Sequence, residues 1–364
     1  MSGMIDIADV AESAILIEDC GPSRRPVWAA RPGRGRPGMH NPFLDWETMG
    51  GVAIRHWRLR NVVLDGDTFL LFHQGRVIRQ SNYHRHPPEL EAARVHPDRL
   101  VQLPDDGPIL VCGDDWSTNH YHFLNHTLPA IHAVAPTVPG LRLIGHPMRP
   151  VHARMVALLG HAHFPLIHIE RGRQYAIPDA IFCDFTMGHA DFACSAFVQG
   201  VADALAGQVA DDGARKGRIY VSRMADTHRH MAGEAALAAG LERRGFRIFA
   251  PAGLRLEEQI RAFRSARIVV GPHGAGLANI AFCRPGTLVY DLLPAHFTDP
   301  SILTLAIRRG AVAWVDAFAS ETSVSDHVQD WQVDVAGALA RVDALMGRGW
   351  LGKASRLFER SQRR

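Results

Sequence analysis

The stretch from Ala266 to Asn279 reads ARIVVGPHGAGLAN and decides the fold class. A β-branched run, Ile268 to Val270, leads into a glycine-rich loop and then into an apolar segment that predicts a helix. A strand, a glycine-rich loop and a helix in this order are typical of the phosphate-binding turn of an α/β domain. Glycines let a backbone approach a ligand closely, and free N–H groups at the start of a helix favour an anion.

The glycines Gly271, Gly274 and Gly276 have the spacing G-x-x-G-x-G. Dinucleotide-binding domains have G-x-G-x-x-G, and the P-loop also needs a lysine, so neither pattern fits. The spacing therefore argues against a dinucleotide-dependent oxidoreductase. The alternative to a phosphate-binding loop is a tight turn between strand and helix that binds no ligand. Asp291 closes the next predicted strand, where a carboxylate can accept hydrogen bonds from a ribose.

The region around this loop, residues 213–330, predicts alternating strands and helices. We expect a Rossmann-like domain with strands at 218–221, 246–249, 268–270 and 287–292 and helices at 233–244, 257–264 and 277–282. A third segment is expected at residues 331–364. It consists of a helix at 333–346 that packs back on the first domain, followed by a basic tail.

Residues 1–212 predict a second α/β domain. A hairpin is expected within 52–71, because Asp65-Gly66 separates two strand-like runs. The other expected elements are strands at 14–17, 109–112, 141–144 and 166–169 and helices at 116–131, 151–159 and 195–209.

Composition limits the class of protein. The chain has 364 residues, 47% hydrophobic and 21% charged, as in ordinary globular proteins. The net charge of +3 is too balanced to indicate a nucleic-acid binder, and no apolar run is long enough for a membrane span. The five scattered cysteines predict buried reduced thiols. With no secretory signal evident, we expect a cytoplasmic protein whose basic residues 353–364 are solvated or touch the inner membrane surface weakly.

Several further pieces resemble glycosyltransferase family 61, which includes plant xylan glycosyltransferases, animal O-linked GlcNAc transferases and bacterial capsular-polysaccharide proteins. In the C-terminal half the matching pieces are Tyr220-Val221-Ser222-Arg223, Arg229, Glu234, Glu258-Gln259-Ile260 and Gly271 to Asn279. The family's N-terminal signature is present as Asn119-His120-Tyr121-His122-Phe123 followed by Leu128-Pro129. Two departures are the lack of a carboxylate in Asn125-His126-Thr127 and Gly233 in place of an asparagine.

The resemblance implies a GT-B-like protein, with two Rossmann-like domains that face a cleft. It implies transfer with inversion from a nucleotide sugar, most often UDP-linked, to a glycan or lipid-linked glycan, as in the biosynthesis of capsules and other surface polysaccharides. It also implies that no metal or other cofactor is required, because positive side chains and helix dipoles stabilise the leaving diphosphate.

The resemblance further implies which residues hold the donor. We expect Arg223 and Arg229 at the diphosphate, since guanidinium groups bind phosphate bidentately, although surface ion pairs are the alternative. His273 is expected beside the phosphates and Asp291 beside the ribose. The full expected set is Ser222, Arg223, Arg229, Glu258, His273, Gly274, Ala275, Gly276 and Asp291.

Inversion needs a base that takes the acceptor proton. The candidates, in order, are His122 within the N-terminal signature, Asp115 in the loop after a predicted strand, and His126. His122 and His126 share one face of the expected helix, a spacing that also suits a divalent metal or core hydrogen bonds. No third ligand is evident, so no metal site is predicted. The second hypothesis for the whole chain is a nucleotide-sugar or glycan-binding protein that has lost its base.

Overall fold

Two compact units make up the chain. The computed structural model describes residues 3–20, 23–24, 39–40, 43, 48–49, 51–185, 195–211, 213, 217–226, 228–318 and 329–347. The first unit comprises Met1–Pro22 and Gly50–Leu205, and the second comprises Ser23–Met49 and Ala206–Arg364. The expected boundary at residue 212 lies close to the division after Leu205, whereas nothing in the sequence indicated that Ser23–Met49 joins the second unit.

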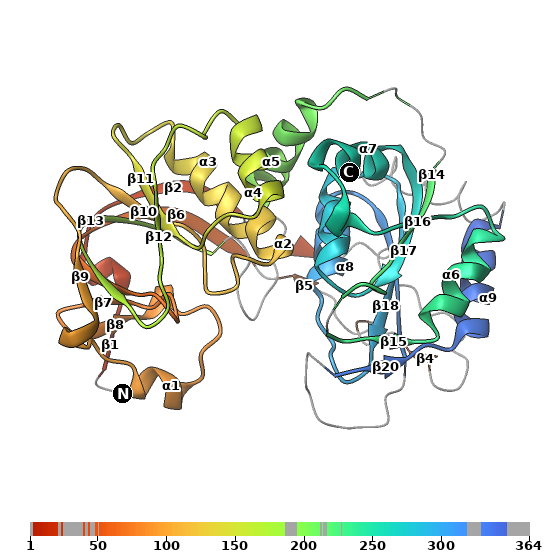
Figure 1. The fold of residues 1–364 in the computed structure, drawn as a ribbon, viewed down its shortest axis with the longest axis horizontal. Coiled ribbons are helices and arrows are strands. Elements are labelled where there is room, and N and C mark those ends of the chain that lie inside the picture. The colour runs from red at the N-terminus through yellow and green to blue at the C-terminus, as the bar shows by residue number, and fades with distance from the viewer. Residues whose placement is uncertain are drawn as a thin grey trace. The chain divides into compact units, whose positions relative to one another are not determined.

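The second unit contains a parallel, doubly wound sheet (Figure 1). Its strands lie in the order β16-β14-β17-β18-β19, and the short strand β4 adds an antiparallel edge. The chain steps from β14 out to β16 and then returns to β17 on the other side of β14. In sheets of this order, ligands bind at the carboxyl ends of the strands beside this reversal. The strands are β4 (Met39–His40), β14 (Gly217–Val221), β16 (Arg247–Phe249), β17 (Ala266–Pro272), β18 (Leu288–Pro294) and β19 (Val312–Phe318).

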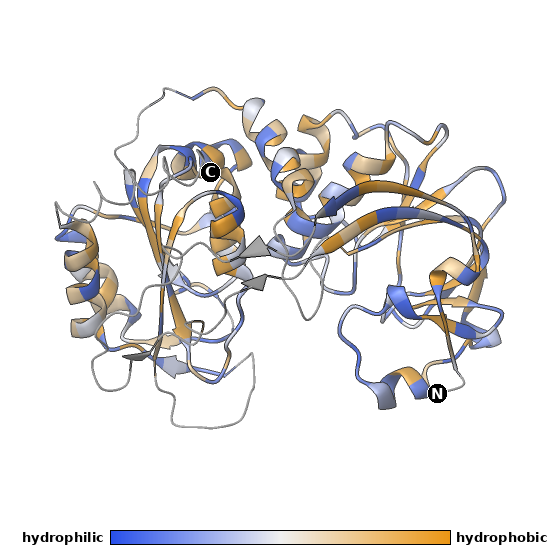
Figure 2. Ribbon diagram, turned by 180° about the vertical axis from the view of Figure 1, so that it is seen from behind, coloured by the Kyte–Doolittle hydropathy of each residue, from blue (hydrophilic) through white to orange (hydrophobic). Residues whose placement is uncertain are grey.

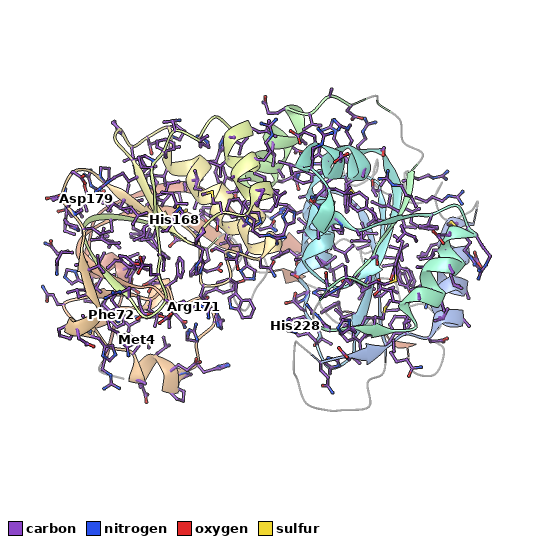
Figure 3. The ribbon with its side chains drawn as sticks, in the orientation of Figure 1. Met4, Phe72, His168, Arg171, Asp179 and His228 are labelled. Atoms are coloured by element: carbon purple, nitrogen blue, oxygen red, sulfur yellow. The ribbon has the colours of Figure 1, made fainter. Side chains whose placement is uncertain are left out.

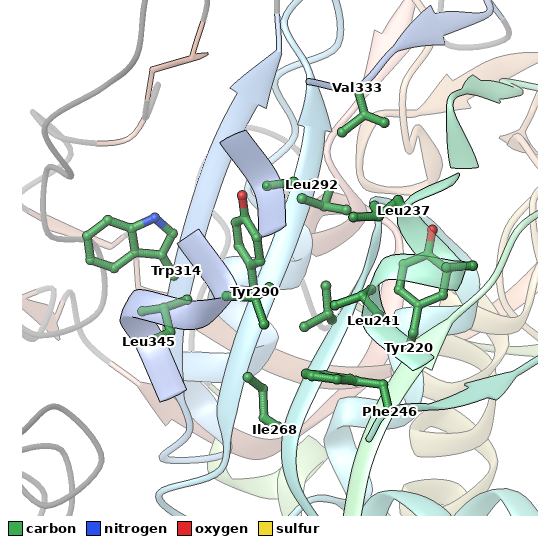
Figure 4. Close-up of a cluster of buried hydrophobic side chains, with 14 of the residues drawn as sticks. Tyr220, Leu237, Leu241, Phe246, Ile268, Tyr290, Leu292, Trp314, Val333 and Leu345 are labelled. Carbon is green, nitrogen blue, oxygen red and sulfur yellow. The ribbon is translucent and has the colours of Figure 1, made fainter. Parts of the chain in front are cut away.

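Helices cover both faces of this sheet. Side chains of α6 and α9 pack with the sheet residues Tyr220, Ile268 and Tyr290 in one buried cluster (Figure 4). Burying side chains of this size contributes roughly 1.5–3 kcal/mol each. α9 therefore packs within the second unit, and the expectation that it returns to the first domain is wrong. The helices are α6 (Glu234–Glu242), α7 (Leu256–Ser265), α8 (Ser301–Arg308), α9 (Val335–Met346) and two 3₁₀ helices, η5 (Pro251–Gly253) and η6 (Ala275–Phe282).

Two glycines delimit α6. Gly233 precedes the helix with a φ of 89°, and Gly245 follows it with a φ of 79°. Both values lie in the left-handed region, which glycine and, less readily, asparagine adopt. The replacement of asparagine by Gly233 therefore keeps the backbone conformation that starts the helix. The short sheet of β15 (Met231–Ala232) and β20 (Trp331–Gln332) lies next to this start.

The first unit contains a mixed sheet of ten strands in the order β1-β8-β7-β6-β13-β10-β11-β12, with β2 paired to β6 and β9 paired to β13. β13, β10, β11 and β12 run parallel, whereas β6 runs antiparallel to β13, β2 and β7. The hairpin expected around Asp65-Gly66 is confirmed, because Leu64 on β6 lies opposite Leu71 on β7. The strands are β1 (Met4–Ile5), β2 (Ala11–Cys20), β6 (Val52–Asp65), β7 (Leu71–His73), β8 (Arg76–Ile78), β9 (Leu100–Gln102), β10 (Ile109–Val111), β11 (Arg142–Gly145), β12 (Leu166–His168) and β13 (Gln174–Cys183).

Short helices complete the first unit. Figure 2 shows hydrophobic residues concentrated along the strands and on the helices that cover them. The predicted helices at 151–159 and 195–209 are confirmed as α4 and α5, whereas the helix expected at 116–131 begins only at His120. The helices are η1 (Ile7–Asp9), η2 (Arg79–Ser81), α1 (Pro87–Ala92), η3 (Pro97–Arg99), α2 (His120–His122), a π-helical stretch η4 (Phe123–Thr127), α3 (Leu128–Val134), α4 (Pro150–Leu158) and α5 (Ala196–Gly207). The α/β class is thus confirmed, and the cleft between two facing domains stays a prediction.

Three other expectations concern cysteines and membrane contact. Cys112, Cys183 and Cys283 are buried free thiols, as predicted. The side chains of Cys20 and Cys194, and the basic residues 353–364, lie outside the described part of the chain. Among the residues that are described, no helix is both long and apolar enough to cross a bilayer.

Asp211 fixes the segment that leads into β14. Its Oδ2 accepts hydrogen bonds from Arg264 Nε at 2.9 Å and from Arg284 Nη2 at 2.5 Å. The hydrogen bond from Arg264 is the largest of the effects that lower the pKa of Asp211 to about 2. Because this folded-state pKa lies below the unfolded value, the stabilisation is present above about pH 4 and is lost as the pH falls through about 2.

We therefore expect Asp211→Asn to lower the free energy of unfolding by about 1–2 kcal/mol near neutral pH. The difference between the two proteins should shrink as the pH falls below about 4, because the wild-type carboxylate then becomes protonated. Thermal unfolding of both proteins from about pH 2 to about pH 7 measures this difference. A difference that stays constant across the range would mean that the charge of Asp211 is not what stabilises the segment.

Candidate active site

The first group of candidate residues lies at the carboxyl ends of β17 and β18, in the second unit. His273 is 4% exposed and Asp291 is 1% exposed. His273 Nδ1 lies 2.9 Å from Asp291 Oδ2, and His273 Nε2 lies 3.8 Å from Asp299 Oδ1. Asp291 thus orients the imidazole ring of His273. The burial of Asp291 does not suit the direct contact with a ribose that the sequence led us to expect.

Arg223, at the carboxyl end of β14, braces the loop that contains His273. Its Nη1 donates to the backbone oxygen of His273 at 2.7 Å, and its Nη2 donates to that of His228 at 3.1 Å. Its Nε pairs with Asp226 at 2.8 Å. A Cβ on Gly274 would collide with Arg223 Nη1, so the glycine makes room for this guanidinium. Arg223 holds the loop in place, and its donors are directed to protein atoms.

Gly276 makes room for a different neighbour. A Cβ at this position would lie 3.0 Å from Val221 Cγ1 and 3.3 Å from Pro251 Cγ. The space beside Gly276 is therefore filled by β14 and the turn after β16. Ala275 and Gly276 begin η6, a 3₁₀ helix that contains the helix expected at 277–282. The expected close approach of a ligand to Gly276 has no support in these contacts, and a Gly276→Val variant would disturb packing before it disturbed binding.

Arg229 lies in the loop after β14, next to His228, which Figure 3 labels. Its Nε and Nη1 are buried and have no hydrogen-bond partner among the described residues. Its guanidinium carbon lies 4.9 Å from the centre of the Phe297 ring. Burial, together with nearby Arg223, lowers the pKa of Arg229 to about 10. A desolvated cation with open donors is the kind of group that binds an anion strongly.

The backbone of Arg229 supports this interpretation. Its φ is 59°, in the left-handed region that a long side chain rarely adopts. Such strain persists only where the surrounding structure imposes it, and it is concentrated at functional sites. Asp291 Oδ1 is also buried without a hydrogen-bond partner among the described residues. The arrangement thus combines an orienting carboxylate, an imidazole and an open guanidinium at the edge of the sheet where ligands bind.

Three other family residues serve to hold this edge together. Glu234 Oε1 accepts hydrogen bonds from Tyr220 Oη, Ser222 Oγ and the backbone N of Arg223, at 3.1, 3.0 and 2.7 Å. Ser222 is therefore engaged with Glu234. Glu258 accepts from the backbone N of Arg255 at 2.9 Å and so caps the start of α7. The structure gives Ser222 and Glu258 local structural roles and places neither with the open donors of Arg229.

The second group of candidates lies in the first unit, after the carboxyl end of β10. Asp114 is fully buried, and its Oδ1 accepts a hydrogen bond from the backbone N of Trp116 at 2.7 Å. Its Oδ2 lies 3.1 Å from His122 Nδ1 and 3.3 Å from His126 Nδ1. Gly113 permits this turn: its φ is 90°, and a Cβ there would collide with Ser117 Oγ and Thr127 Oγ1.

The helix that presents the two histidines begins late and contains a π-helical stretch. Asn119 Oδ1 accepts a hydrogen bond from the backbone N of Tyr121 at 2.8 Å, which caps α2. η4 follows, between His122 and the end of the signature, and π-helical turns are frequent at functional sites. Asp114 thus places a carboxylate beside both histidines, although the sequence has none at 125–127. Sequence reasoning missed this residue, although the run Gly113-Asp114-Asp115 offered both acids.

The charges in this group favour an ionised Asp114. Burial alone would raise the pKa of Asp114, but hydrogen bonds from His122 and His126 outweigh it and hold the pKa below its usual value. The His122 side chain is 15% exposed, compared with 1% for His126. Because His122 Nδ1 faces Asp114, its Nε2 is the nitrogen available to a substrate. Trp116 stacks on His122 with ring centres 6.2 Å apart and is 39% exposed, so it can also contact a sugar.

Asp115 lies beside this group and has a different partner. Its Oδ2 accepts from Arg85 Nη2 at 2.5 Å, and its Oδ1 lies 3.6 Å from His84 Nδ1. Burial raises the pKa of Asp115 to about 6, against the opposing effect of Arg85. The carboxylate is therefore committed to an ion pair, whereas His122 has an orienting carboxylate behind it.

Comparison with known proteins agrees with the motifs in both groups. Residues 120–290 match the family model described as Glycosyltransferase 61. The matched segment resembles glycosyltransferase family 61 over slightly less than half of the chain. It includes His122, His126, Arg229 and His273, whereas Asp114, Asp115 and Asp291 lie just outside it.

Two individual proteins are also similar to this chain. A β-1,2-xylosyltransferase from Arabidopsis thaliana is 30% identical over 59 residues, which are 16% of this chain and 11% of that enzyme. Among solved structures, the E. coli heptosyltransferase WaaC with ADP aligns with 12% identity and a TM-score of 0.33. That alignment covers 65% of this chain and 97% of the heptosyltransferase.

Proposed function

We propose that this protein is an inverting glycosyltransferase that takes a sugar from a nucleotide diphosphate donor. The observation that carries the proposal is the pairing of Asp114 with His122, a residue of the segment that matches the glycosyltransferase 61 model. The open guanidinium of Arg229 supplies the second requirement, a binding site for a leaving diphosphate. The Arabidopsis thaliana protein that is similar to part of this chain is a β-1,2-xylosyltransferase, which supports a sugar as the group transferred.

The donor half of the reaction uses Arg229 and His273. In the proposal, the diphosphate accepts hydrogen bonds from Nε and Nη1 of Arg229, the buried donors that lack protein partners. His273, held by Asp291, adds a further polar contact on the same edge of the sheet. When the bond between the anomeric carbon and the phosphate oxygen breaks, the guanidinium stabilises the negative charge that the diphosphate retains. No metal is needed for this step.

The acceptor half uses His122. Its Nε2 takes the proton of the acceptor hydroxyl as the hydroxyl oxygen attacks the anomeric carbon from the side opposite the phosphate. Asp114, bonded to Nδ1, keeps the ring in the correct tautomer and stabilises the imidazolium that forms. Attack on the opposite side inverts the configuration of the sugar.

The finer features of the proposal rest on the family resemblance. They are a UDP-linked donor, a glycan or lipid-linked glycan acceptor, a role in capsule or other surface polysaccharide synthesis, and a cytoplasmic location. The competing function, a nucleotide-sugar-binding protein without catalysis, predicts donor binding without transfer. The Asp114–His122 pair favours transfer, since binding alone has no need of an oriented base.

A donor panel tests the proposal. Thermal shift and nucleotide release should be measured with UDP-sugars, GDP-mannose, CMP-sialic acid and NAD(H), each with and without a mixture of oligosaccharide acceptors. We expect one of the nucleotide diphosphate sugars to stabilise the protein and to release its nucleotide faster when acceptors are present. Stabilisation by NAD(H) alone would contradict the proposal and restore the oxidoreductase alternative.

A further inference from the structure

Three side chains in the first unit converge in the way that a metal site requires. One ligand atom from each of Asp114, His122 and His126 lies within 4.8 Å of the other two, and Asp114 Oδ2 is close to Nδ1 of both histidines. Two of the separations are 3.1 and 3.3 Å. In a tetrahedral zinc site with bonds of about 2.0–2.1 Å, neighbouring ligand atoms lie about 3.3 Å apart. We propose that Asp114, His122 and His126 bind a divalent cation of the zinc class, and that this cation prevents His122 from acting as the base.

The donor set fits this class of cation. Two imidazole nitrogens and one carboxylate oxygen are common zinc ligands, and three protein ligands leave a fourth position for water. The carboxylate is fixed from behind, because Asp114 Oδ1 accepts the backbone N–H of Trp116 at 2.7 Å. Outer contacts of this kind orient the ligands of bound metals. The side chains of Asp114 and His126 are each 1% exposed, so two of the three ligands are surrounded by protein.

The surroundings of the two rings support the same arrangement. The ring of Tyr83 lies edge-on to both, with centres 5.3 Å from His122 and 5.2 Å from His126. The π-helical stretch Phe123–Thr127 lies directly after His122 and contains His126. The two imidazoles are thus held by aromatic contact and by the backbone in positions that direct both Nδ1 atoms to one oxygen.

Binding of the cation and catalysis exclude each other. A cation at His122 Nδ1 occupies one lone pair of the ring and leaves a proton on Nε2, so Nε2 cannot accept the proton of an acceptor hydroxyl. The cation also takes Asp114 Oδ2, the oxygen that orients His122. Zinc should therefore inhibit a transfer that itself needs no metal. The inhibition of transfer by zinc rests on the proposed function, whereas the binding of the cation does not.

The binding test uses the full chain after removal of metals with EDTA. Calorimetric titration with Zn²⁺, and visible absorption on titration with Co²⁺, should show one site per chain for the wild type. His126→Gln and Asp114→Asn should each weaken Zn²⁺ binding by at least about tenfold, because each removes a ligand atom. His132→Gln is the matched control, since it removes a histidine of another close pair, with His132 Nδ1 2.9 Å from His161 Nε2.

The result expected is loss of affinity in His126→Gln and Asp114→Asn but not in His132→Gln. Absence of a stoichiometric site in the wild type, or equal affinity in wild type and both ligand variants, would overturn the metal site. Melting temperatures of all variants show whether each is folded, and His122→Gln provides a third ligand variant should one fail to fold.

The inhibition test compares transfer by each protein with and without one equivalent of Zn²⁺. We expect Zn²⁺ to lower the transfer rate of the wild type by at least about tenfold, and EDTA to restore that rate. For His126→Gln, the transfer rates with and without Zn²⁺ should be nearly equal. Zinc that binds without slowing transfer would overturn the mutual exclusion. If no transfer is detected even without metal, the proposed function fails, and the calorimetric result still decides whether the cation binds.

Discussion

His122→Ala is expected to lose about 10²- to 10⁴-fold in turnover while it still binds the donor, because it removes the general base and leaves the second unit intact. Donor affinity is the essential second measurement. His122 lies in the first unit, whereas Arg229 and His273 lie in the second, and a folded variant should therefore keep the wild-type donor dissociation constant. Turnover with saturating donor and acceptor, together with calorimetric titration of the nucleotide, measures both.

Asp115→Asn is the matched control for this variant. It alters a carboxylate that neighbours the same group but pairs with Arg85. If Asp115→Asn abolishes turnover and His122→Ala does not, the base is the carboxylate. Asp114→Asn should also slow turnover, because the amide cannot stabilise the imidazolium. Wild-type turnover in both His122→Ala and Asp115→Asn would leave His126 as the remaining candidate.

Arg229→Met is expected to weaken binding of the donor nucleotide diphosphate by about 30- to 150-fold, which corresponds to about 2–3 kcal/mol for a charged hydrogen-bonded contact. Methionine fills much of the same volume and keeps contact with the ring of Phe297 but offers no donor. Because Arg229 Nε and Nη1 have no hydrogen-bond partners among the described residues, the unliganded protein loses no protein hydrogen bond at these atoms. The melting temperature without nucleotide should therefore stay at or above the wild-type value.

This combination of readouts separates a binding role from a structural one. Arg267→Gln is the matched control, since it removes the same charge from an exposed position on β17 and should change the affinity little. Calorimetric titration of UDP and differential scanning fluorimetry measure the two quantities. A large drop in melting temperature with unchanged affinity would show that Arg229 is a structural residue and would remove the phosphate contact from the proposed mechanism.

The sequence alone predicted the second unit well because each of its signals was local. β-branched runs, Gly245 after a helix and the glycine loop each depend on a few neighbouring residues, and the strands β14, β17 and β18 follow from them. The sequence did not specify the type of the helix expected at 277–282, which is η6, a 3₁₀ helix rather than an α-helix, in contact with α7 and α8. Hydrophobic periodicity cannot distinguish the two kinds of helix over so short a stretch.

The first unit was harder to predict because its sheet depends on distant pairing. β13 contains Pro178, which argues against a strand in a sequence, yet β13 pairs with β6 over most of its length. β2 extends well beyond the expected residues 14–17 because it pairs along β6. Pairing between residues more than a hundred positions apart leaves no local signal.

The candidate site shows the same limit. His122, Arg229 and His273 were predicted because they lie within the family motifs, and their burial and partners agree with functional roles. Asp114 was missed because its role depends on a turn at Gly113 that brings it to a helix eight residues later. Arg223 was expected at the phosphates, but its partners are the backbone oxygens of His273 and His228, which only the folded loop reveals.

We propose above all that this chain transfers a sugar from a nucleotide diphosphate with inversion. The most direct test incubates the wild-type protein with the donor identified in the panel and an acceptor mixture, and determines the anomeric configuration of the product by proton NMR while nucleotide release is followed. We expect a new glycosidic bond of configuration opposite to that of the donor, with one nucleoside diphosphate released per bond formed. A donor that binds but yields neither nucleotide nor product with any acceptor would contradict the account and identify the protein as a binding protein without catalysis.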